Sequence, residues 1–231
     1  MSKTIDRQWT SVARTAAGSQ RWVQRLLVGC GIAAPVLYVV MNIVAAIRFT
    51  GYSTVNQTVS ELSAVSAPSR PLWVRLAIVY GLLLVAFGVG VWLSARAKRS
   101  LRIVGALLVA DGLIGFFWPP MHLRGAGTSL TDTMHIFFTA VTVPILVAAI
   151  LVGATAFGRW FRISSIASIV LTLGFGALTG LSGARIPKNL PTPWVGVWER
   201  ISIAAFMAWF VVLAIALLRG ARTPKTQGRA T

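Results

Sequence analysis

The sequence predicts an all-α membrane protein, a bundle of six transmembrane helices with a short amphipathic helix in the first outer loop. Of the 231 residues, 56% are hydrophobic and 12% are charged, about half the charged share of soluble proteins. Six long apolar runs follow one another, and each approaches the roughly 20 residues that a bilayer requires. Basic residues fall in short runs between them, so the net charge of +17 indicates membrane topology rather than nucleic-acid binding.

The N-terminal residues 1–25 are basic and lack apolar periodicity, which predicts a tail outside the membrane. Residues 26–47 carry no charge and form the first predicted span. This run is too long for the core of a signal peptide, so we expect it to remain as a helix. Residues 26–218 then form the transmembrane domain, and residues 219–231 form a second basic tail.

The first outer loop, residues 48–71, is polar but patterned. Val55, Val59, Leu62 and Ser66 recur at helical spacing, and Thr54 with Gln57 fits a capping box. These features predict a short amphipathic helix that lies on the membrane surface.

The later apolar runs predict five more spans, over residues 72–95, 101–118, 134–157, 163–184 and 201–218. Pro119 and Pro120 end the third predicted span, because proline has no backbone N–H to donate. Cys30 is the only cysteine, which excludes an internal disulfide and a cysteine-ligated metal site.

The distribution of basic residues predicts the orientation. With six spans, 15 Lys and Arg residues fall on the side of the termini and 7 on the other side. Because positive charge is retained in the cytoplasm, we expect both termini to be cytoplasmic in a bacterial cytoplasmic membrane. Trp22, Trp92 and Trp160 then mark the inner interface.

The fifth predicted span carries small residues at every fourth position, namely Ser164, Ser168, Thr172, Gly176, Gly180 and Ala184. Small residues at this spacing let helix backbones approach closely. We therefore expect this span to be central, with Gly176 and Gly180 available to contact a helix partner.

The acids and histidines gather on the predicted outer side, which holds four of the five acids and both histidines. Asp111 lies roughly 10 Å below the end of the third predicted span. A charge at this depth costs a few kcal/mol, so Asp111 is either functional or a structural acid with a polar partner.

The fourth predicted span opens with Asp132 and His135, which share one helix face. We expect Asp132 to cap the helix and His135 to be the better site residue. Glu199 lies at the start of the sixth span, where a negative charge also stabilises the free amides of the helix terminus. Arg200 points about 100° away from it, so the two are not an obvious ion pair.

These groups predict an outward-facing polar pocket with Asp111 and His135 at its floor. The expected ligand-binding residues are Glu61, Asp111, His122, Arg124, His135, Glu199 and Arg200. His135, Asp111 and His122 could instead bind zinc, or the carboxylates and histidines could act as acid and base. The catalytic candidates are Asp111, His135, Glu61 and Ser63. Ser60, Ser63 and Ser66, beside Glu61, could include a nucleophile, although serines on an amphipathic helix more often face solvent or cap it. No HExxH, Gly-x-Ser-x-Gly or phosphate-binding glycine loop is present.

Three features resemble a bacterial and archaeal membrane family, domain of unknown function family 998. They are the tract GYSTVNQTVSELSA in the first outer loop, the acid in the third span before a proline-ended helix, and the histidine that opens the fourth span. The resemblance covers most of residues 26–218 and implies about six helices without an established activity. Ser63 stands where the family form Ser-acid-Leu-Gly-Ala has glycine.

The chain more distantly resembles the alkaline-ceramidase and adiponectin-receptor superfamily of zinc-dependent membrane hydrolases. Ser63, Asp111 and His135 are the counterparts that this resemblance implies. The paired histidines of a late helix and a seventh span are missing from this sequence, so the resemblance bears only on the class of reaction.

Three functions agree with these patterns. The leading hypothesis is a membrane protein that binds or moves a lipid or small molecule through the polar pocket. The alternative is a metal-dependent membrane hydrolase of a lipid amide or ester, in which a metal-bound water attacks and Asp111 or Glu61 moves the proton. A third is a structural subunit that contacts a partner through the stripe of small residues.

Overall fold

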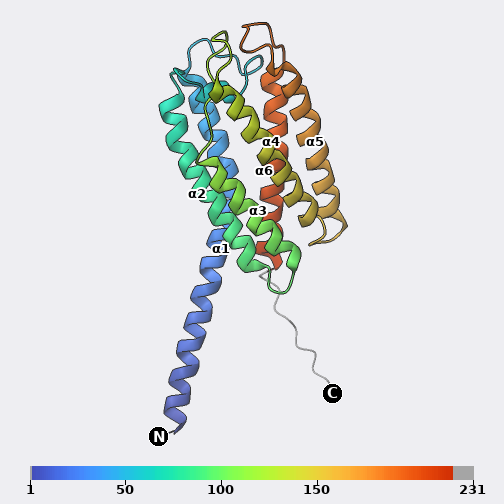
Figure 1. Ribbon diagram of the computed structural model, residues 1–231. Helices are drawn as coiled ribbons and strands as arrows, with labels where there is room; N and C mark the ends of the chain where they lie inside the picture. The colour runs from blue at the N-terminus through green and yellow to red at the C-terminus, as the bar shows by residue number, and fades with distance from the viewer. Residues whose placement is uncertain (1, 221–231) are drawn as a thin grey trace.

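The computed structural model describes the backbone of residues 2–220 and the side chains of residues 18–220, and this part of the chain is all-helical. Its six α-helices alternate in direction (Figure 1), as the sequence predicts. They are α1 (Ser2–Arg48), α2 (Arg70–Ser94), α3 (Arg99–Gly115), α4 (Leu130–Gly153), α5 (Arg159–Gly183) and α6 (Val195–Gly220), with one 3-10 turn, η1 (Ser60–Ser63), between α1 and α2.

Five of these helices, all except α3, are long and apolar enough to cross a membrane. Their outward side chains are apolar, including the exposed Val36, Leu82 and Trp160. The helix α3 has 17 residues and is therefore about 26 Å long, somewhat short of the roughly 30 Å of a hydrocarbon core. The described chain is thus a membrane-type helical protein, and the sixth predicted crossing depends on α3, its shortest α-helix.

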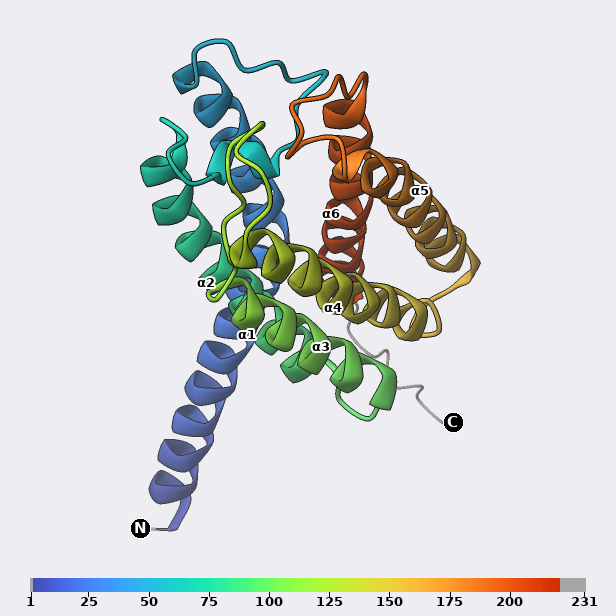
Figure 2. The ribbon, with the colours of Figure 1, turned by 45° about the horizontal axis from the view of Figure 1, so that its top comes forward.

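The helices pack in a ring in which α2 lies between α1 and α3, α4 packs on α3, and α6 packs on both α1 and α5. Figure 2 shows α3 and α4 crossing in front of α1 and α2, with α5 at the edge. The core between them is filled by large side chains that are almost fully buried, namely Phe87, Leu108, Ile150, Trp209 and Phe210.

The tightest helix pair is α2 with α3, which meet through glycines. A Cβ added at Gly88 would lie 2.8 Å from the Gly105 carbonyl oxygen, and one added at Gly105 would lie 2.7 Å from the Gly88 carbonyl oxygen. Gly81 and Gly112 repeat this approach two turns further along. Small residues therefore do bring two helices together here.

The expectation that the fifth span is central is wrong. The helix α5 packs mainly against α6 and is the least buried of the five long helices. Ser168 and Thr172 do use the stripe, since the Ser168 hydroxyl donates to the Ala205 carbonyl at 2.6 Å and Thr172 hydrogen-bonds with Ser202. Gly180 faces open space, so a partner helix at this position stays a prediction.

The first outer loop does not form the predicted surface helix. Its only helical turn is η1, in which Glu61, Leu62 and Ser63 are buried. The side chain of Gln57 accepts from the amide of Ser53 rather than from Thr54. The loop turns inward because Glu61 and Thr58 find their polar partners among the loops at one end of the bundle. The contacts made by this burial stabilise the loop more than a surface helix through Val55, Val59 and Leu62 would.

The predicted N-terminal tail is helical, and its place outside the membrane stays a prediction. The helix α1 begins at Ser2, so the segment predicted as a basic tail continues the first span as helix. In Figure 1 this part of α1 extends beyond the rest of the bundle. Residues 221–231, most of the second predicted tail, lie outside the described residues.

We predict that Gly88→Ala lowers the free energy of unfolding by about 1 to 3 kcal/mol, because the new methyl group must push α3 away from α2. The matched control is Gly180→Ala, where a Cβ meets nothing within 4 Å. Thermal unfolding in detergent compares the two variants. Equal midpoints for both would show that the α2–α3 contact does not limit stability.

Candidate functional site

The connections α1–α2, α3–α4 and α5–α6 meet at one end of the bundle, which we call the loop-rich end (Figure 1). Backbone hydrogen bonds join them in pairs: Val65 donates to Met121 at 2.8 Å, Gly125 to Ile186 at 3.1 Å, and Gly196 to Val55 at 3.0 Å. Segments far apart in the sequence therefore form a single cap. All seven predicted ligand-binding residues except Asp111 belong to this cap or to the first turns of α4 and α6 below it.

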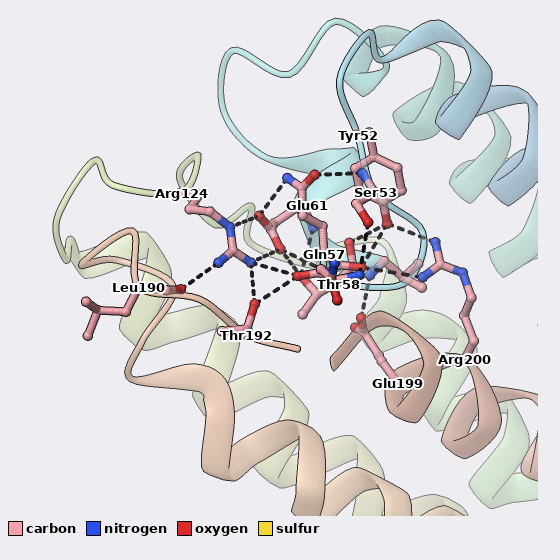
Figure 3. Close-up of polar contacts among 12 residues, drawn as sticks. Tyr52, Ser53, Gln57, Thr58, Glu61, Arg124, Leu190, Thr192, Glu199 and Arg200 are labelled. Atoms are coloured by element: carbon pink, nitrogen blue, oxygen red, sulfur yellow. Dashed lines mark hydrogen bonds and ion pairs between the residues drawn. The ribbon is translucent and has the colours of Figure 1, made fainter. Parts of the chain in front are cut away.

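A buried ion pair between Glu61 and Arg124 lies at the centre of the cap (Figure 3). Arg124 Nε donates to Glu61 Oε1 at 3.0 Å, and its Nη2 donates to Oε2 at 3.1 Å. The Glu61 side chain is only 1% exposed. Its oxygens also accept from Gln57 Nε2 and from the amide and hydroxyl of Thr58. This two-pronged geometry is the strongest form of the Arg–carboxylate contact.

The remaining donors of Arg124 hold the other two connections. They reach the Leu190 carbonyl at 3.0 Å, the Thr192 hydroxyl at 2.9 Å and the Asn56 carbonyl at 3.3 Å. Because Glu61 and Arg124 satisfy one another and their surroundings, their contacts are structural. Every polar atom of the two side chains already has a partner within the protein. The prediction that they bind a ligand therefore gains no support from their geometry.

Arg200 forms a second anchor, on the first turns of α6. Its guanidinium donates to Asn42 Oδ1 of α1, to the Tyr52 hydroxyl at 2.8 Å and to the Thr54 carbonyl at 2.9 Å. Burial raises the pKa of Tyr52 to about 12, against the lowering effect of the Arg200 hydrogen bond. Tyr52 therefore keeps its proton at neutral pH and donates it to the Thr58 carbonyl at 2.7 Å.

A polar relay of three side chains, which we call the Ser60 relay, connects η1 with α4 and α6. Ser60 Oγ lies 3.1 Å from Glu199 Oε1 and 3.2 Å from His135 Nε2. Glu199 also accepts from the Val59 amide. His135 is buried, and its Nδ1 lies 2.8 Å from the Pro119 carbonyl oxygen. The Trp118 ring meets the imidazole edge to face at 5.3 Å.

The hydrogen-bonding groups of the Ser60 relay allow two proton arrangements. Nδ1 of His135 carries a hydrogen, because the Pro119 carbonyl can only accept. In a neutral ring Nε2 then accepts from the Ser60 hydroxyl, and the contact to Glu199 needs a proton on the carboxyl group. With His135 doubly protonated, Ser60 instead donates to the Glu199 carboxylate. One mobile proton is thus shared across Glu199, Ser60 and His135.

The prediction that Asp132 caps the fourth span is confirmed. Asp132 and Ser129 form a capping box at the start of α4. Asp132 also accepts from the His122 amide at 2.7 Å and lies 3.2 Å from His122 Nδ1. Both His122 and Asp132 are therefore occupied in fixing the α3–α4 connection.

Asp111 does not join the other predicted site residues. No hydrogen bond links it to His135 among the described side chains, and its buried Oδ1 has no partner. His122, His135 and Asp111 each have separate surroundings, and no group of three His, Cys, Asp or Glu side chains with the spacing of a metal site occurs in residues 18–220. The described side chains therefore do not assemble the predicted zinc ligands.

The chain matches the model of a known protein family. The family described as Protein of unknown function (DUF998) matches residues 32–216. The chain belongs to this family. The matched segment of this DUF998 protein contains the whole Ser60 relay and the Glu61–Arg124 pair. No similar curated protein and no similar solved structure was found, and the likeness to the alkaline-ceramidase and adiponectin-receptor superfamily is not shown.

Among the serines of the DUF998 tract that the sequence offers as nucleophiles, the structure favours Ser60 over Ser63 as a reactive group. The Ser63 hydroxyl donates to the Ser60 carbonyl at 3.0 Å and contributes to the turn η1. Ser60 is separated from His135 by 75 residues, and no local pattern reports such a contact. The one sequence signal is that Ser60 adjoins the acid of the tract.

We predict that Arg124→Gln in this DUF998 protein lowers the free energy of unfolding by about 3 kcal/mol, because it leaves the buried Glu61 carboxylate without its partner. Arg185→Gln is the matched control, since Arg185 is exposed in a neighbouring loop and its loss should change stability by less than about 0.5 kcal/mol. Denaturant unfolding in micelles measures both. Similar free energies of unfolding for both variants would show that the Glu61–Arg124 ion pair does not stabilise the cap.

Proposed function

We propose that this protein is a membrane-embedded serine hydrolase that cleaves an acyl ester or amide of a lipid at the loop-rich end. The observation that carries the proposal is the contact of Ser60 Oγ with His135 Nε2 at 3.2 Å, with His135 Nδ1 held by the Pro119 carbonyl. A nucleophile within hydrogen-bond reach of a base, and a base oriented by a third group, is the general arrangement for acyl transfer.

The reaction would run in two halves. Ser60 Oγ attacks the acyl carbon while its proton passes to His135 Nε2, and His135 then returns that proton to the leaving alcohol or amine as the acyl bond breaks. Water next attacks the acyl-serine, His135 takes a proton from it, and the carboxylic acid leaves as Ser60 regains its hydrogen. Protons and bonds balance without any further reactant.

Glu199 would position the nucleophile. It accepts from the Val59 amide, and its Oε1 lies 3.1 Å from Ser60 Oγ, so it fixes the start of η1 relative to α6. In its protonated form it donates to Ser60 Oγ, which leaves the Ser60 hydroxyl hydrogen directed at Nε2 of a neutral His135, as attack requires.

The surroundings of the Ser60 relay favour a lipid substrate. His135 lies in the second turn of α4, next to the exposed apolar side chains of Ile136 and Phe137, and Trp118 borders the imidazole. Aromatic and apolar side chains at a helix end are typical of the level of the headgroups and acyl bonds of a bilayer. An ester or amide bond at this level could approach from the membrane.

A second candidate function is the binding or movement of a lipid or small molecule, as the sequence suggests first. The observation that favours it is the buried Oδ1 of Asp111, which has no partner among the described residues. An ionisable group inside a membrane helix is often part of a ligand or proton path. In that case the Ser60 relay would move a proton rather than form an acyl bond.

We further propose that the loop-rich end faces outward from a bacterial cytoplasmic membrane, as the unequal distribution of basic residues favours. In a Cys30→Ser background, we expect Thr128→Cys in the α3–α4 connection to react with a membrane-impermeant maleimide in intact cells. Ala97→Cys, in the α2–α3 connection, should react only after the cells are permeabilised. The opposite pattern would reverse the orientation.

The nucleophile can be tested with a fluorophosphonate probe on protein in lipid nanodiscs. We expect the wild type to be labelled and Ser60→Ala to be unlabelled, while Ser63→Ala, its matched control, keeps labelling. His135→Gln should slow labelling by at least about a hundredfold, the usual contribution of a general base.

Two results would reject Ser60 as the nucleophile, and the first of them favours the second candidate. One is a wild type that stays unlabelled while its thermal unfolding shows a folded protein. The other is labelling of Ser60→Ala at the wild-type rate. In the second case, mass spectrometry of the labelled peptide identifies the residue that reacts.

A further inference from the structure

The end of the bundle opposite the loops, which we call the basic end, contains cations without carboxylate partners. The two ion pairs among the described side chains both lie at the loop-rich end. No Asp or Glu of residues 18–220 lies at the basic end. Nine basic side chains are found there: Arg21, Arg25, Arg96, Lys98, Arg99, Arg102, Arg159, Arg162 and Arg219.

A groove of about 660 Å³ opens at this end between α2 and α3. One wall is Trp92 of α2 with Ala97 of the connection, and the other is one face of α3, formed by Arg99, Arg102, Ile103, Ala106 and Leu107. Residues at this spacing lie above one another on a helix. The α3 face therefore changes from two guanidiniums at the end of the bundle to apolar side chains deeper in the membrane.

The guanidiniums of this groove have donors to spare. Arg99 makes no hydrogen bond to another described residue through its side chain, and Arg102 uses one nitrogen to reach the Arg96 carbonyl at 3.0 Å. Both side chains are exposed. Planar guanidiniums match phosphate oxygens in geometry and charge, and Trp92, 48% exposed, is the residue type found beside lipid headgroups.

We propose that this groove binds one anionic glycerophospholipid, with its phosphate between Arg99 and Arg102 and an acyl chain along Ile103, Ala106 and Leu107. The two arginines of the groove favour a negatively charged headgroup, and its apolar wall favours an acyl chain. A zwitterionic lipid would bring its own cation to a site without acids, and free phosphate would leave the apolar wall uncovered. A volume of this size lies within the range of pockets that hold small ligands.

The length of α3 places the groove at the right depth. Because α3 is about 4 Å shorter than the hydrocarbon core, its basic first turn cannot extend far past the acyl chains. Arg99 and Arg102 then lie at the level of lipid phosphates, and a bound headgroup supplies the negative charge that they lack within the protein.

Native mass spectrometry of detergent-solubilised protein tests the proposal. We expect titration with dioleoyl phosphatidylglycerol to give one adduct that forms well before those of dioleoyl phosphatidylcholine. The double variant Arg99→Gln/Arg102→Gln should bind phosphatidylglycerol about thirtyfold more weakly, the combined effect of two basic side chains near an anionic lipid. The matched control Arg159→Gln/Arg162→Gln removes two cations of the same end outside the groove and should keep the adduct.

A shape variant tests the apolar wall separately from the charge. Ala106→Trp fills the groove, keeps both arginines and should also lose the phosphatidylglycerol adduct. The proposal is overturned if the two double variants lose affinity equally, which would indicate general attraction to a basic surface. It is also overturned if inorganic phosphate competes as well as the lipid does, or if Ala106→Trp binds like the wild type. Thermal unfolding of each variant checks that it is folded.

Discussion

The pairing of Glu61 with Arg124 is the contact on which the loop-rich end depends. A carboxylate that is 1% exposed costs several kcal/mol to bury unless it is paired and hydrogen-bonded. Arg124 meets this need and at the same time binds Leu190 and Thr192. One guanidinium therefore contacts all three connections, and η1 is held with them. The position of Ser60, one residue before Glu61, follows from that pairing.

Two carboxylates on opposite sides define the geometry of η1. Glu61 binds inward to Arg124, whereas Glu199 binds the Val59 amide and the Ser60 hydroxyl from the start of α6. A turn of four residues has too few internal hydrogen bonds to be rigid alone. Side chains from other elements therefore hold the Ser60 hydroxyl within reach of His135, and the relay depends on a cap that must be intact before any proton can move.

Features that depend on neighbouring residues could be predicted from the sequence, and features that depend on distant contacts could not. The long apolar runs identified the helices, and Ser129 with Asp132 formed the cap expected from local spacing. Ser60 and His135 are 75 residues apart, and Glu61 and Arg124 are 63 apart, so only the tertiary fold pairs them. The small residues of α5 misled for a related reason. They permit close packing without requiring it, and a close backbone approach formed instead between Gly88 and Gly105.

The unequal charge of the two ends gives one physical account of both proposals. At the loop-rich end, Arg124 and Arg200 direct their donors to Glu61, Asn42, Tyr52 and backbone carbonyls. These cations build the fold and are not free to bind anions. At the basic end, Arg99 and Arg102 have no acid beside them, so their counter-charge must come from outside the described chain. The same residue type thus orders a polar network at one end and favours an anionic lipid at the other, because the carboxylates of residues 18–220 are present at only one of the two.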